Sequence, residues 1–311
     1  MSKIAFIFPG QGAQVCGMGQ EFYEQTETGK EVFDKASELL GFSVPELCFE
    51  KNDRLDLTEY TQPAMVTASI AMTKVFVEKT GITPSVTAGL SLGEYAAMAA
   101  AGVMSWEDAI ATVRQRGILM QEAVPAGLGA MAAVLAMDAQ KIEEVIAPID
   151  GVQIANYNCP GQIVISGRKE AVAEASERLK EAGAKRVLPL NVSGPFHSSM
   201  LAEAGKKLGK VLEGVEVHTP QIPYVANVNA SYVTEQEEIE PLLVKQVSNS
   251  VRWQQSVETM VADGVDTFIE IGPGRTLAGF NKKIAKAIGK ELTTYNGATM
   301  EDIDKVVEAL K

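Results

Sequence analysis

The chain has 311 residues, which is long enough for one large domain with an insertion or for two modest domains. Its composition, 46% hydrophobic and 22% charged, suffices for a sizeable buried core. The 28 basic and 40 acidic side chains give a net charge of −12. This charge argues against a nucleic-acid-binding protein, because such a protein needs a concentrated basic face. It also offers no attraction to anionic membranes.

The N-terminus and the cysteines indicate a cytoplasmic protein. The five apolar residues from Ile4 to Phe8 are too few for the core of a signal peptide. No stretch reaches the ~20 apolar residues that a membrane span requires. The three cysteines are far apart and odd in number, so they predict neither a disulfide framework nor a CxxC site. Two histidines in the whole chain argue against a His-rich metal site.

The first predicted elements are two buried strands and a helix. Ile4–Phe8 is an apolar run that ends at Pro9, and Val86–Leu90 is a second run that ends at a serine. Short apolar runs closed by turn residues are typical of strands that are buried on both faces. The segment Gly93–Ala101 then has a helical composition. This part of the chain therefore predicts a strand–turn–helix unit of a parallel sheet.

The middle of the chain predicts a smaller sheet of its own. Strand-like and helix-like runs alternate here: strand 129–137, helix 138–147 with Asp138 as N-cap, strand 152–157, turn 158–161, strand 162–166, helix 169–182 and strand 186–192. This β-α-β-β-α-β order is the ferredoxin-like one. Because the order contains a hairpin, we expect a small antiparallel α+β domain inserted into the larger one.

After this insertion the first pattern returns, with a strand at Thr267–Ile271 and a helix at Leu277–Ile288. Buried strands that alternate with helices predict a doubly wound α/β domain with a mostly parallel sheet. Loop residues at 125–127 and 193–195 indicate the junctions. We therefore expect a large α/β hydrolase-like domain over residues 1–127 and 193–311, and an inserted ferredoxin-like domain over residues 128–192.

The pentapeptide Gly89–Gly93 matches G-x-S-x-G and lies between a predicted strand and a predicted helix. In such a turn the glycines permit a sharp bend that lifts the hydroxyl of Ser91 above the sheet. The helix N-terminus and the next backbone N–H then stabilise an oxyanion. A plain glycine-rich turn is the alternative, but the strand–turn–helix context favours Ser91 as a nucleophile.

Only two histidines are available as a general base for Ser91. His218 lies in an alternating polar and apolar segment, where we expect an exposed strand residue. His197 lies where the inserted domain returns to the large one, and clefts form at domain junctions. We predict His197 as the base; the alternative is a residue at a helix start. No carboxylate lies in a recognisable motif, so an acid or a backbone carbonyl could orient the histidine.

Two further segments carry candidate site residues. The glycine-containing loop 8–14 follows the first strand, and we interpret it as a second backbone N–H donor to the oxyanion or as a plain turn. Arg114 and Arg116 lie in a segment with helical spacing, 109–120. Each is either a solvated helix residue or, if it points into the cleft, a bidentate partner for a substrate carboxylate. Composition and spacing do not choose between the two arginines.

Six blocks occur together in the chain: FPGQG at 8–12, GLSLGEY at 89–95, RQRG at 114–117, NCPGQ at 158–162, GPFHS at 194–198 and QVSNSVRW at 246–253. In this order the blocks resemble the malonyl-CoA:acyl-carrier-protein transacylase family of fatty-acid synthesis, and more distantly the acyltransferase domains of polyketide synthases. The chain departs from the family pattern at Leu90, where many members carry histidine, and at Ser250, where proline is common.

The resemblance implies roles for seven residues: Ser91 as the acylated nucleophile, His197 as its base, Gln246 as the residue whose main-chain carbonyl orients the histidine, Gln11 and Leu92 as backbone N–H donors of the oxyanion hole, Arg116 as the clamp for the malonyl carboxylate, and Phe196 as a signature of malonyl selection. The carbonyl of Gln246 would explain why no acid motif accompanies the histidine.

The resemblance also implies a ping-pong acyltransferase that moves malonyl from malonyl-CoA to Ser91 and then to the phosphopantetheine thiol of an acyl carrier protein. Coenzyme A thioester is a substrate in this scheme, and no cofactor or metal is expected. Carrier proteins of this kind are acidic, as this chain is, so docking requires a local basic patch. The candidates are residues 185–186, 206–210 and 282–286. We expect a monomer.

Two other functions share these features. A serine esterase or thioesterase has the same elbow but resolves the acyl-enzyme with water, and a non-catalytic scaffold would only bind the carrier. The ferredoxin-like insertion argues against the first, and the presence of both Ser91 and His197 argues against the second. The carrier's docking face, tolerance of methylmalonyl and the choice between a fatty-acid and a polyketide pathway stay open.

Overall fold

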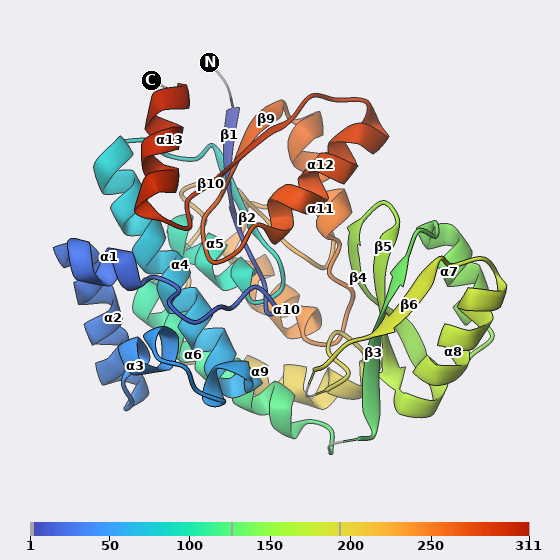
Figure 1. Cartoon of the computed structure of the whole chain (residues 1–311). Helices are drawn as coiled ribbons and strands as arrows, with labels where there is room; N and C mark the ends of the chain where they lie inside the picture. The colour runs from blue at the N-terminus through green and yellow to red at the C-terminus, as the bar shows by residue number, and fades with distance from the viewer. Residues whose placement is uncertain (1–2, 126, 193, 311) are drawn as a thin grey trace.

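The computed structural model describes residues 3–125, 127–192 and 194–310, and it contains two separate sheets (Figure 1). The strands of the larger sheet are β1 (Lys3–Phe8), β2 (Val86–Gly89), β7 (Tyr224–Val225), β8 (Tyr232–Val233), β9 (Val265–Glu270) and β10 (Thr293–Asn296). Their order is β10-β9-β1-β2-β7-β8, and only the β7–β8 pair is antiparallel. The expected mostly parallel α/β sheet is confirmed.

The central strand β1 explains why the first apolar run of the sequence is a strand. Ala5, Phe6, Ile7 and Phe8 are all completely buried. Because side chains alternate along a strand, Phe6 and Phe8 enter one hydrophobic cluster and Ala5 and Ile7 enter another on the opposite face. A strand between two such layers has no solvated face, which accounts for the absence of polar residues from Ile4 to Phe8.

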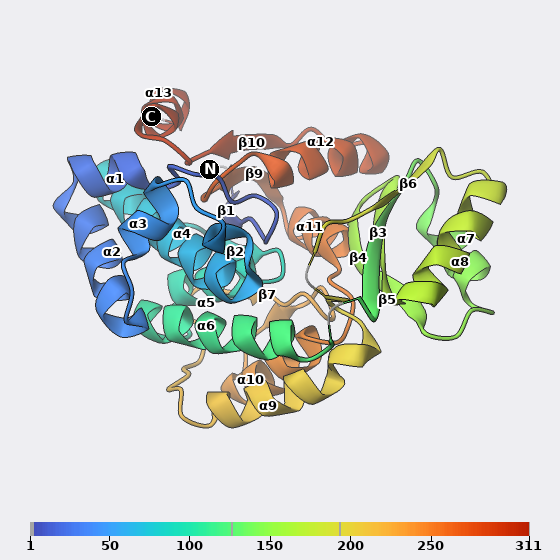
Figure 2. The same ribbon diagram turned by 60° about the horizontal axis from the view of Figure 1, so that its bottom comes forward.

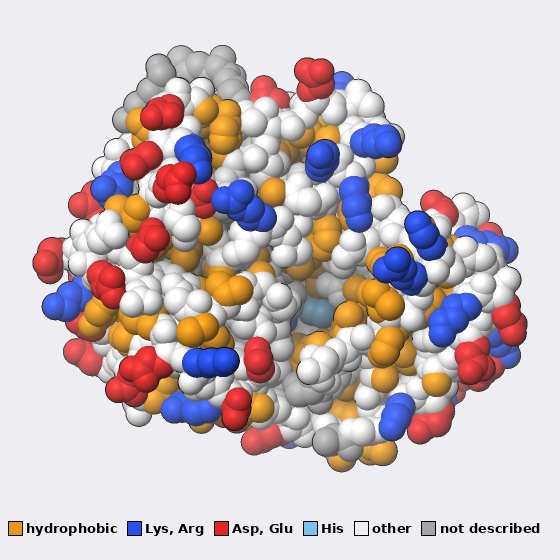
Figure 3. Space-filling view, in the orientation of Figure 1, with side chains coloured by type: hydrophobic (Ala, Val, Ile, Leu, Met, Phe, Trp, Pro, Cys, Tyr) orange, Lys and Arg blue, Asp and Glu red, His pale blue; other side chains and the backbone are white. Residues whose placement is uncertain are grey.

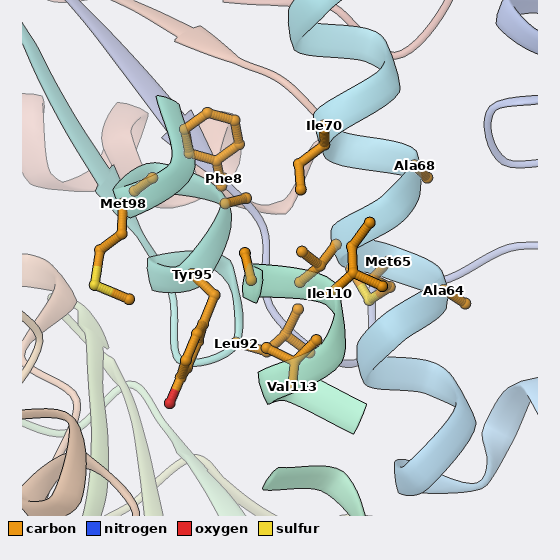
Figure 4. Packing of buried hydrophobic residues seen from close by; sticks show 14 of the residues in the cluster. Phe8, Ala64, Met65, Ala68, Ile70, Leu92, Tyr95, Met98, Ile110 and Val113 are labelled. Carbon is orange, nitrogen blue, oxygen red and sulfur yellow. The ribbon is translucent and has the colours of Figure 1, made fainter. Parts of the chain in front are cut away.

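Helices cover both faces of this sheet (Figure 2). The helices are α1 (Gln20–Gln25), α2 (Glu27–Leu40), α3 (Val44–Phe49), α4 (Thr58–Thr80), α5 (Gly93–Ala100), α6 (Trp106–Glu122), α9 (Ala202–Leu212), α10 (Gln236–Gln246), α11 (Trp253–Ala262), α12 (Thr276–Ile288) and α13 (Met300–Leu310), with short 3-10 turns η1 (Arg54–Asp56) and η2 (Ser199–Leu201). In Figure 4, side chains of α4, α5 and α6 pack together beside Phe8. This packing holds the start of α5, and with it the turn that precedes α5.

The smaller sheet comes from one continuous stretch of the chain. Its elements are β3 (Gly129–Leu135), α7 (Ala139–Ile146), β4 (Val152–Cys159), β5 (Gln162–Arg168), α8 (Lys169–Glu181) and β6 (Arg186–Pro189). The sheet is antiparallel with order β4-β5-β3-β6, and α7 and α8 cover its outer face (Figure 2). The predicted ferredoxin-like order is confirmed, and Asp138 caps α7 by accepting from the Gln140 backbone N–H.

Several element ends differ by one to three residues from the sequence-based expectation, among them the ends of β3, at Leu135 rather than residue 137, and of β5, at Arg168 rather than residue 166. Strand β4 continues to Cys159, so Asn158 lies in a strand and the turn is confined to residues 160–161. Strand β6 ends at Pro189 rather than at residue 192. Beyond Pro189 the Leu190 N–H still donates to the Met131 carbonyl at 2.9 Å, so the chain stays beside β3 for one more residue. The expected domain boundary at residue 193 falls outside the described residues.

Strand β4 connects the small sheet to the loop after α10. The Tyr157 N–H donates to the Val251 carbonyl at 2.9 Å, and the Val251 N–H donates to the Ala155 carbonyl at 2.8 Å. The Ser250 hydroxyl donates to the Ile154 carbonyl, so serine uses a contact that proline lacks. These bonds hold the loop after α10 against the small sheet. No helix in the described ranges is long and apolar enough to cross a bilayer.

Candidate active site

Ser91 lies on the sharp turn between β2 and α5, with a φ of 54°. Glycines on both sides permit this turn. A Cβ atom at Gly89 would lie 2.0 Å from the carbonyl carbon of Gly93, and a Cβ at Gly93 would lie 2.3 Å from the carbonyl oxygen of Phe8. Because real Cβ atoms do not come this close, only glycine fits at either position. The turn therefore has the shape of a nucleophile elbow at the carboxyl end of a parallel strand.

The imidazole of His197 meets this serine. His197 Nε2 lies 2.7 Å from Ser91 Oγ, and His197 Nδ1 lies 2.8 Å from the main-chain carbonyl oxygen of Gln246. A carbonyl oxygen only accepts hydrogen bonds, so Nδ1 carries the proton and the lone pair of Nε2 faces the serine hydroxyl. The structure thus forms a serine–histidine–carbonyl relay from three segments that are far apart in the sequence.

The environment of His197 keeps the imidazole neutral. Burial, and after it the positive charge of Arg116, lowers the pKa of His197 to about 4. The backbone carbonyls of Gln246 and Asn249 oppose this shift, because they stabilise the protonated ring. At neutral pH the ring is therefore an uncharged acceptor for the serine proton, as a general base must be.

Arg116 is the arginine that enters the site. Its side chain is 1% exposed, Nη1 donates to Gln62 Oε1 at 2.8 Å, and Nη2 donates to Gln246 Oε1 at 2.9 Å and to Ser91 Oγ at 3.1 Å. Burial lowers the pKa of the guanidinium, while Tyr95 and Glu94 oppose this effect. Its Nε atom is buried without a hydrogen-bond partner among the described residues. A buried guanidinium with a spare donor is a ready partner for a carboxylate.

Arg114 lies outside the site, although it is only two residues away. It forms an ion pair with Glu59 at 2.9 Å, and its guanidinium lies over the rings of Phe42 and Tyr60. Two residues on a helix are about 200° apart around the axis, so Arg114 and Arg116 point to nearly opposite sides. The structure thus resolves the choice that spacing left open.

These groups border one cavity of about 360 Å³. Figure 3 shows a hollow between the two parts of the molecule, with a histidine side chain at its floor. The predicted site residues that line the cavity are Gln11, Ser91, Leu92, Arg116, Phe196 and His197. The small sheet contributes the opposite wall through Met131, Ala133 and Val164. Of the seven predicted site residues, Gln246 alone does not line the cavity; it contacts His197 and Arg116 from the protein interior.

Two backbone N–H groups at the cavity are free to stabilise an oxyanion. The Ser91 N–H is not available, because it donates to Asn227 Oδ1 at 2.7 Å. In the described part of the chain, neither the Leu92 nor the Gln11 backbone N–H donates a hydrogen bond. The two loops touch, since a Cβ at Gly10 would lie 2.6 Å from the Leu90 carbonyl oxygen. Gln11 and Leu92 both line the cavity, so their N–H groups are candidates for an oxyanion hole.

Three polar residues of the site were missed by the sequence analysis: Gln62, Glu94 and Asn227. Glu94 is 1% exposed and lies in the first turn of α5. An acid in that position typically interacts with the helix dipole at the surface, so its pattern does not reveal burial. Gln62 and Asn227 belong to no motif. None of the three could have been identified without the tertiary contacts.

The remaining histidine is remote from this site. The His218 side chain is 56% exposed, which confirms the expectation that it faces solvent. The expected strand is wrong: residues 215–219 form no strand, and the His218 backbone N–H donates instead to the Val103 carbonyl at 2.7 Å. His197 is therefore the histidine that can serve Ser91.

Comparisons with known proteins identify the family of the chain. Residues 5–304 match the acyl transferase domain family. A Bacillus subtilis malonyl CoA-acyl carrier protein transacylase is 48% identical over 316 residues, covering 100% of this chain and 98% of that protein. The crystal structure of the corresponding transacylase from Clostridium perfringens has a TM-score of 0.94 at 42% identity, covering 99% of this chain and 97% of that one.

A third relative was solved with a partner. A malonyl-transacylase in complex with its type II PKS acyl-carrier protein (PlMCAT:AntF) has a TM-score of 0.95 at 40% identity, covering 99% of this chain and 100% of that one. The similarity thus extends over full-length proteins and over both sheets of the fold. The family match and these full-length relatives show that the chain belongs to the acyl transferase domain family.

Proposed function

We propose that this chain transfers a malonyl group from malonyl-CoA to the thiol of an acyl carrier protein through a malonyl-serine intermediate. One observation carries the proposal: the 2.7 Å contact between Ser91 Oγ and His197 Nε2 lies directly beside the buried guanidinium of Arg116. A nucleophile and a carboxylate partner in one cavity suit a substrate that carries both a thioester and a carboxylate. The names of the full-length relatives support the same reaction.

The first half-reaction acylates Ser91. His197 Nε2 accepts the hydroxyl proton as Oγ attacks the thioester carbonyl carbon, and the carbonyl oxygen becomes an oxyanion. The N–H groups of Gln11 and Leu92 donate to this oxygen; the loss of one such donor costs ~3 kcal/mol of transition-state stabilisation. The tetrahedral intermediate then collapses, the C–S bond breaks, and the imidazolium returns its proton to the departing coenzyme A sulfur.

Arg116 selects the acyl group. In the free enzyme its Nη2 donates to Ser91 Oγ and to Gln246 Oε1, while Nε has no partner among the described residues. The malonyl carboxylate takes up these donors in a bidentate pair. An acetyl group has no carboxylate and leaves the buried guanidinium without an anionic partner. Acetyl transfer is therefore disfavoured by several kcal/mol, on the order of the cost of breaking a buried ion pair.

The second half-reaction reverses the first with another thiol. The carrier's phosphopantetheine thiol gives its proton to His197 Nε2 and attacks the malonyl-serine carbonyl. The same backbone N–H groups hold the oxyanion, the C–O bond to Ser91 breaks, and Ser91 Oγ recovers the proton from the imidazolium. Because the cavity wall includes the small sheet, the phosphopantetheine arm reaches the serine between the two sheets.

We infer that the carrier docks where α12 and the start of β5 border the cavity. Lys283 Nζ donates to Gln162 Oε1 at 3.2 Å, and Gln162 and Phe280 both line the cavity. Basic side chains gather above and to the right of the hollow in Figure 3. By contrast, Lys206 on α9 is paired with Glu203. Among the described residues, Lys282, Lys283 and Lys286 form no ion pair. An acidic carrier is attracted to such a basic rim, and this attraction weakens with salt.

This docking site is tested by charge reversal. Lys282→Glu with Lys286→Glu should raise the KM for the carrier several-fold at low salt and leave hydrolysis of malonyl-CoA unchanged, while Lys206→Glu should change neither. An equal effect of the α9 control would remove the assignment.

The transferase is separated from the two rival functions by one experiment. The protein is incubated with malonyl-CoA, its intact mass is measured, and carrier protein bearing phosphopantetheine is then added. A stable malonyl adduct that Ser91→Ala abolishes, and that moves to the carrier, supports the transferase. Rapid release of free malonate identifies a hydrolase, and the absence of an adduct identifies a non-catalytic scaffold.

The proposal includes four further expectations: activity without a cofactor, location in the cytoplasm, a monomeric state, and a division into a large part (1–127 and 193–311) and an inserted part (128–192). Exhaustive dialysis against chelator should leave transfer intact. Sedimentation should give the mass of one chain, and cell fractionation should recover the enzyme with the cytoplasm. Limited proteolysis should cut first near residues 127 and 193; protection at both places would contradict the division.

A further inference from the structure

A carboxylate without a direct cationic partner is buried behind the nucleophile. Glu94 is 1% exposed, and in the described part of the chain no lysine, arginine or histidine forms an ion pair with it. Its Oε2 accepts from Gln246 Nε2 at 2.7 Å and from the Asn227 backbone N–H at 3.3 Å. Burying a carboxylate is costly even when hydrogen bonds compensate, so its position calls for a physical reason.

Gln246 is the residue through which Glu94 reaches the rest of the site. The main-chain carbonyl of Gln246 accepts from His197 Nδ1. Its side-chain Oε1 accepts from Arg116 Nη2, and its Nε2 also donates to the Ser91 carbonyl at 3.0 Å. One residue therefore contacts the base through its main chain and the carboxylate clamp through its side chain.

Glu94 determines which way the Gln246 amide points. With Nε2 toward the carboxylate and Oε1 toward the guanidinium, both contacts join a donor to an acceptor. A flipped amide would set its NH₂ group against the Arg116 donors and its oxygen against the Glu94 oxygen, which creates two repulsive contacts at once. The acceptor at Glu94 and the donor at Arg116 thus allow a single orientation.

Asn227 extends the same arrangement to the elbow. Its side-chain oxygen accepts from the Ser91 N–H at 2.7 Å, and its Nδ2 donates to the Gly89 carbonyl at 2.6 Å. Because its backbone N–H donates to Glu94, the carboxylate is connected to both sides of the turn that holds Ser91.

We propose that Glu94 is a positioning residue for the transfer reaction: its carboxylate fixes Gln246 so that the base and the carboxylate clamp are oriented together around Ser91. This inference rests on the proposed malonyl transfer and adds to it a residue that touches no substrate. In a catalytic triad the acid contacts the histidine directly. Here Glu94 acts on Gln246, whose main-chain carbonyl in turn contacts the imidazole of His197.

The test compares three substitutions of Glu94. Glu94→Ala removes the acceptor and should lower kcat by about tenfold to a hundredfold, because small misplacements of catalytic groups have effects of that size. It should also lower the ratio of malonyl to acetyl kcat/KM. Glu94→Gln keeps an acceptor of the same length and should restore both quantities to near the wild-type values. Glu94→Asp keeps the charge but shortens the reach, and should resemble Glu94→Ala.

A matched control separates positioning from stability. Glu270 on β9 is also a completely buried carboxylate, but it accepts from the Leu277 and Ala278 backbone N–H groups at the start of α12. Glu270→Gln should lower the Tm and leave the malonyl-to-acetyl ratio per folded molecule unchanged. If Glu94→Ala does not fold, the comparison of Glu94→Asp with Glu94→Gln gives the same information.

Three results would overturn the inference: an unchanged donor ratio in Glu94→Ala or Glu94→Asp, a loss of turnover that only follows the unfolded fraction, or a Glu94→Gln variant as impaired as Glu94→Ala. A wild-type protein that forms no malonyl-serine would instead remove the proposed function itself, so the two failures are distinguishable.

Discussion

At the scale of single residues, the site depends on an uncharged imidazole and a charged guanidinium held side by side. Burial and Arg116 both disfavour the protonated ring of His197, whose pKa falls from 6.5 to about 4. The same burial disfavours the charge on Arg116, which the neighbouring Glu94 helps to offset. Arg116 therefore helps to keep His197 neutral, while Tyr95 and Glu94 help to keep Arg116 charged.

This pKa predicts an unusual acid limb in the pH dependence of the reaction. The base works as neutral imidazole, and its pKa is depressed, so activity is lost only as pH falls through about 4. We expect kcat/KM for malonyl-CoA to be nearly constant between about pH 7 and pH 5, where an ordinary histidine would already be protonated. Initial rates across this range check the prediction, with circular dichroism to verify folding. An acid limb near pH 6.5 would contradict it.

A second residue-scale prediction concerns donor selection by Arg116. Arg116→Ala removes the carboxylate partner, so malonyl transfer should fall by a hundredfold or more, roughly the loss of several kcal/mol, while acetyl transfer falls less or rises. Arg114→Ala is the matched control, because Arg114 lies on the same helix but pairs with Glu59 outside the cavity. Steady-state kinetics with both donors measure the ratio. An equal loss for both donors would remove the clamp role.

At the scale of secondary-structure elements, the elbow shows how far local signals extend. The apolar run, the glycines and the helix-forming segment predicted β2, the turn and α5 in the order that the structure has. The prediction works because a tight strand-to-helix turn excludes side chains at fixed offsets from the nucleophile, and this exclusion is visible in the sequence as Gly89 and Gly93.

The elbow therefore predicts a large effect of one methyl group. Gly93→Ala would place a Cβ 2.3 Å from the Phe8 carbonyl oxygen, so the turn must shift; acylation of Ser91 should fall more than about tenfold and the Tm should drop. Gly279→Ala on α12 is the control, since its Cβ meets nothing within 4 Å, and it should stabilise the protein by about 0.5–1 kcal/mol. Acylation rates and thermal unfolding of both variants decide the matter.

At the scale of the whole molecule, the small sheet does more than cover the cavity. Gln153 on β4 donates from Nε2 to the His197 carbonyl at 3.2 Å and to the Ser248 carbonyl at 3.4 Å, and its Oε1 accepts from the Ser199 N–H at 2.9 Å. His197 has a φ of 55°, a backbone conformation that residues other than glycine rarely adopt. One small-sheet side chain thus braces the strained backbone of the base.

This contact predicts that a substitution in the small sheet affects chemistry more than binding. Gln153→Ala should lower kcat by about tenfold and leave the KM for malonyl-CoA nearly unchanged, because the base moves while the cavity keeps its shape. Gln140→Ala on α7, whose side chain bonds to Glu144 alone among the described residues, should leave both constants as in the wild type. A wild-type kcat in Gln153→Ala would show that the brace is dispensable.

The sequence by itself predicted the elements of the small sheet, part of those of the large one, and two candidate residues. The spacing of apolar residues and the residues typical of turns are signals that act over a few positions. They predicted the parallel sheet, the ferredoxin-like order, and the candidates Ser91 and His197. The low number of histidines did the rest, because only two could serve the serine. Roles for Gln11, Leu92, Gln246 and Phe196 came from the resemblance of whole blocks and not from local pattern.

The tertiary structure decided everything that depends on which side of an element faces the cavity. It chose Arg116 over Arg114, buried Glu94 behind the nucleophile, and brought Gln153 of the small sheet to the backbone of His197. These relations join segments that are between tens and more than a hundred residues apart, and they depend on how helices and sheets pack. Local sequence carries no record of such packing, since the same polar residue is solvated on one face of a helix and buried on the other.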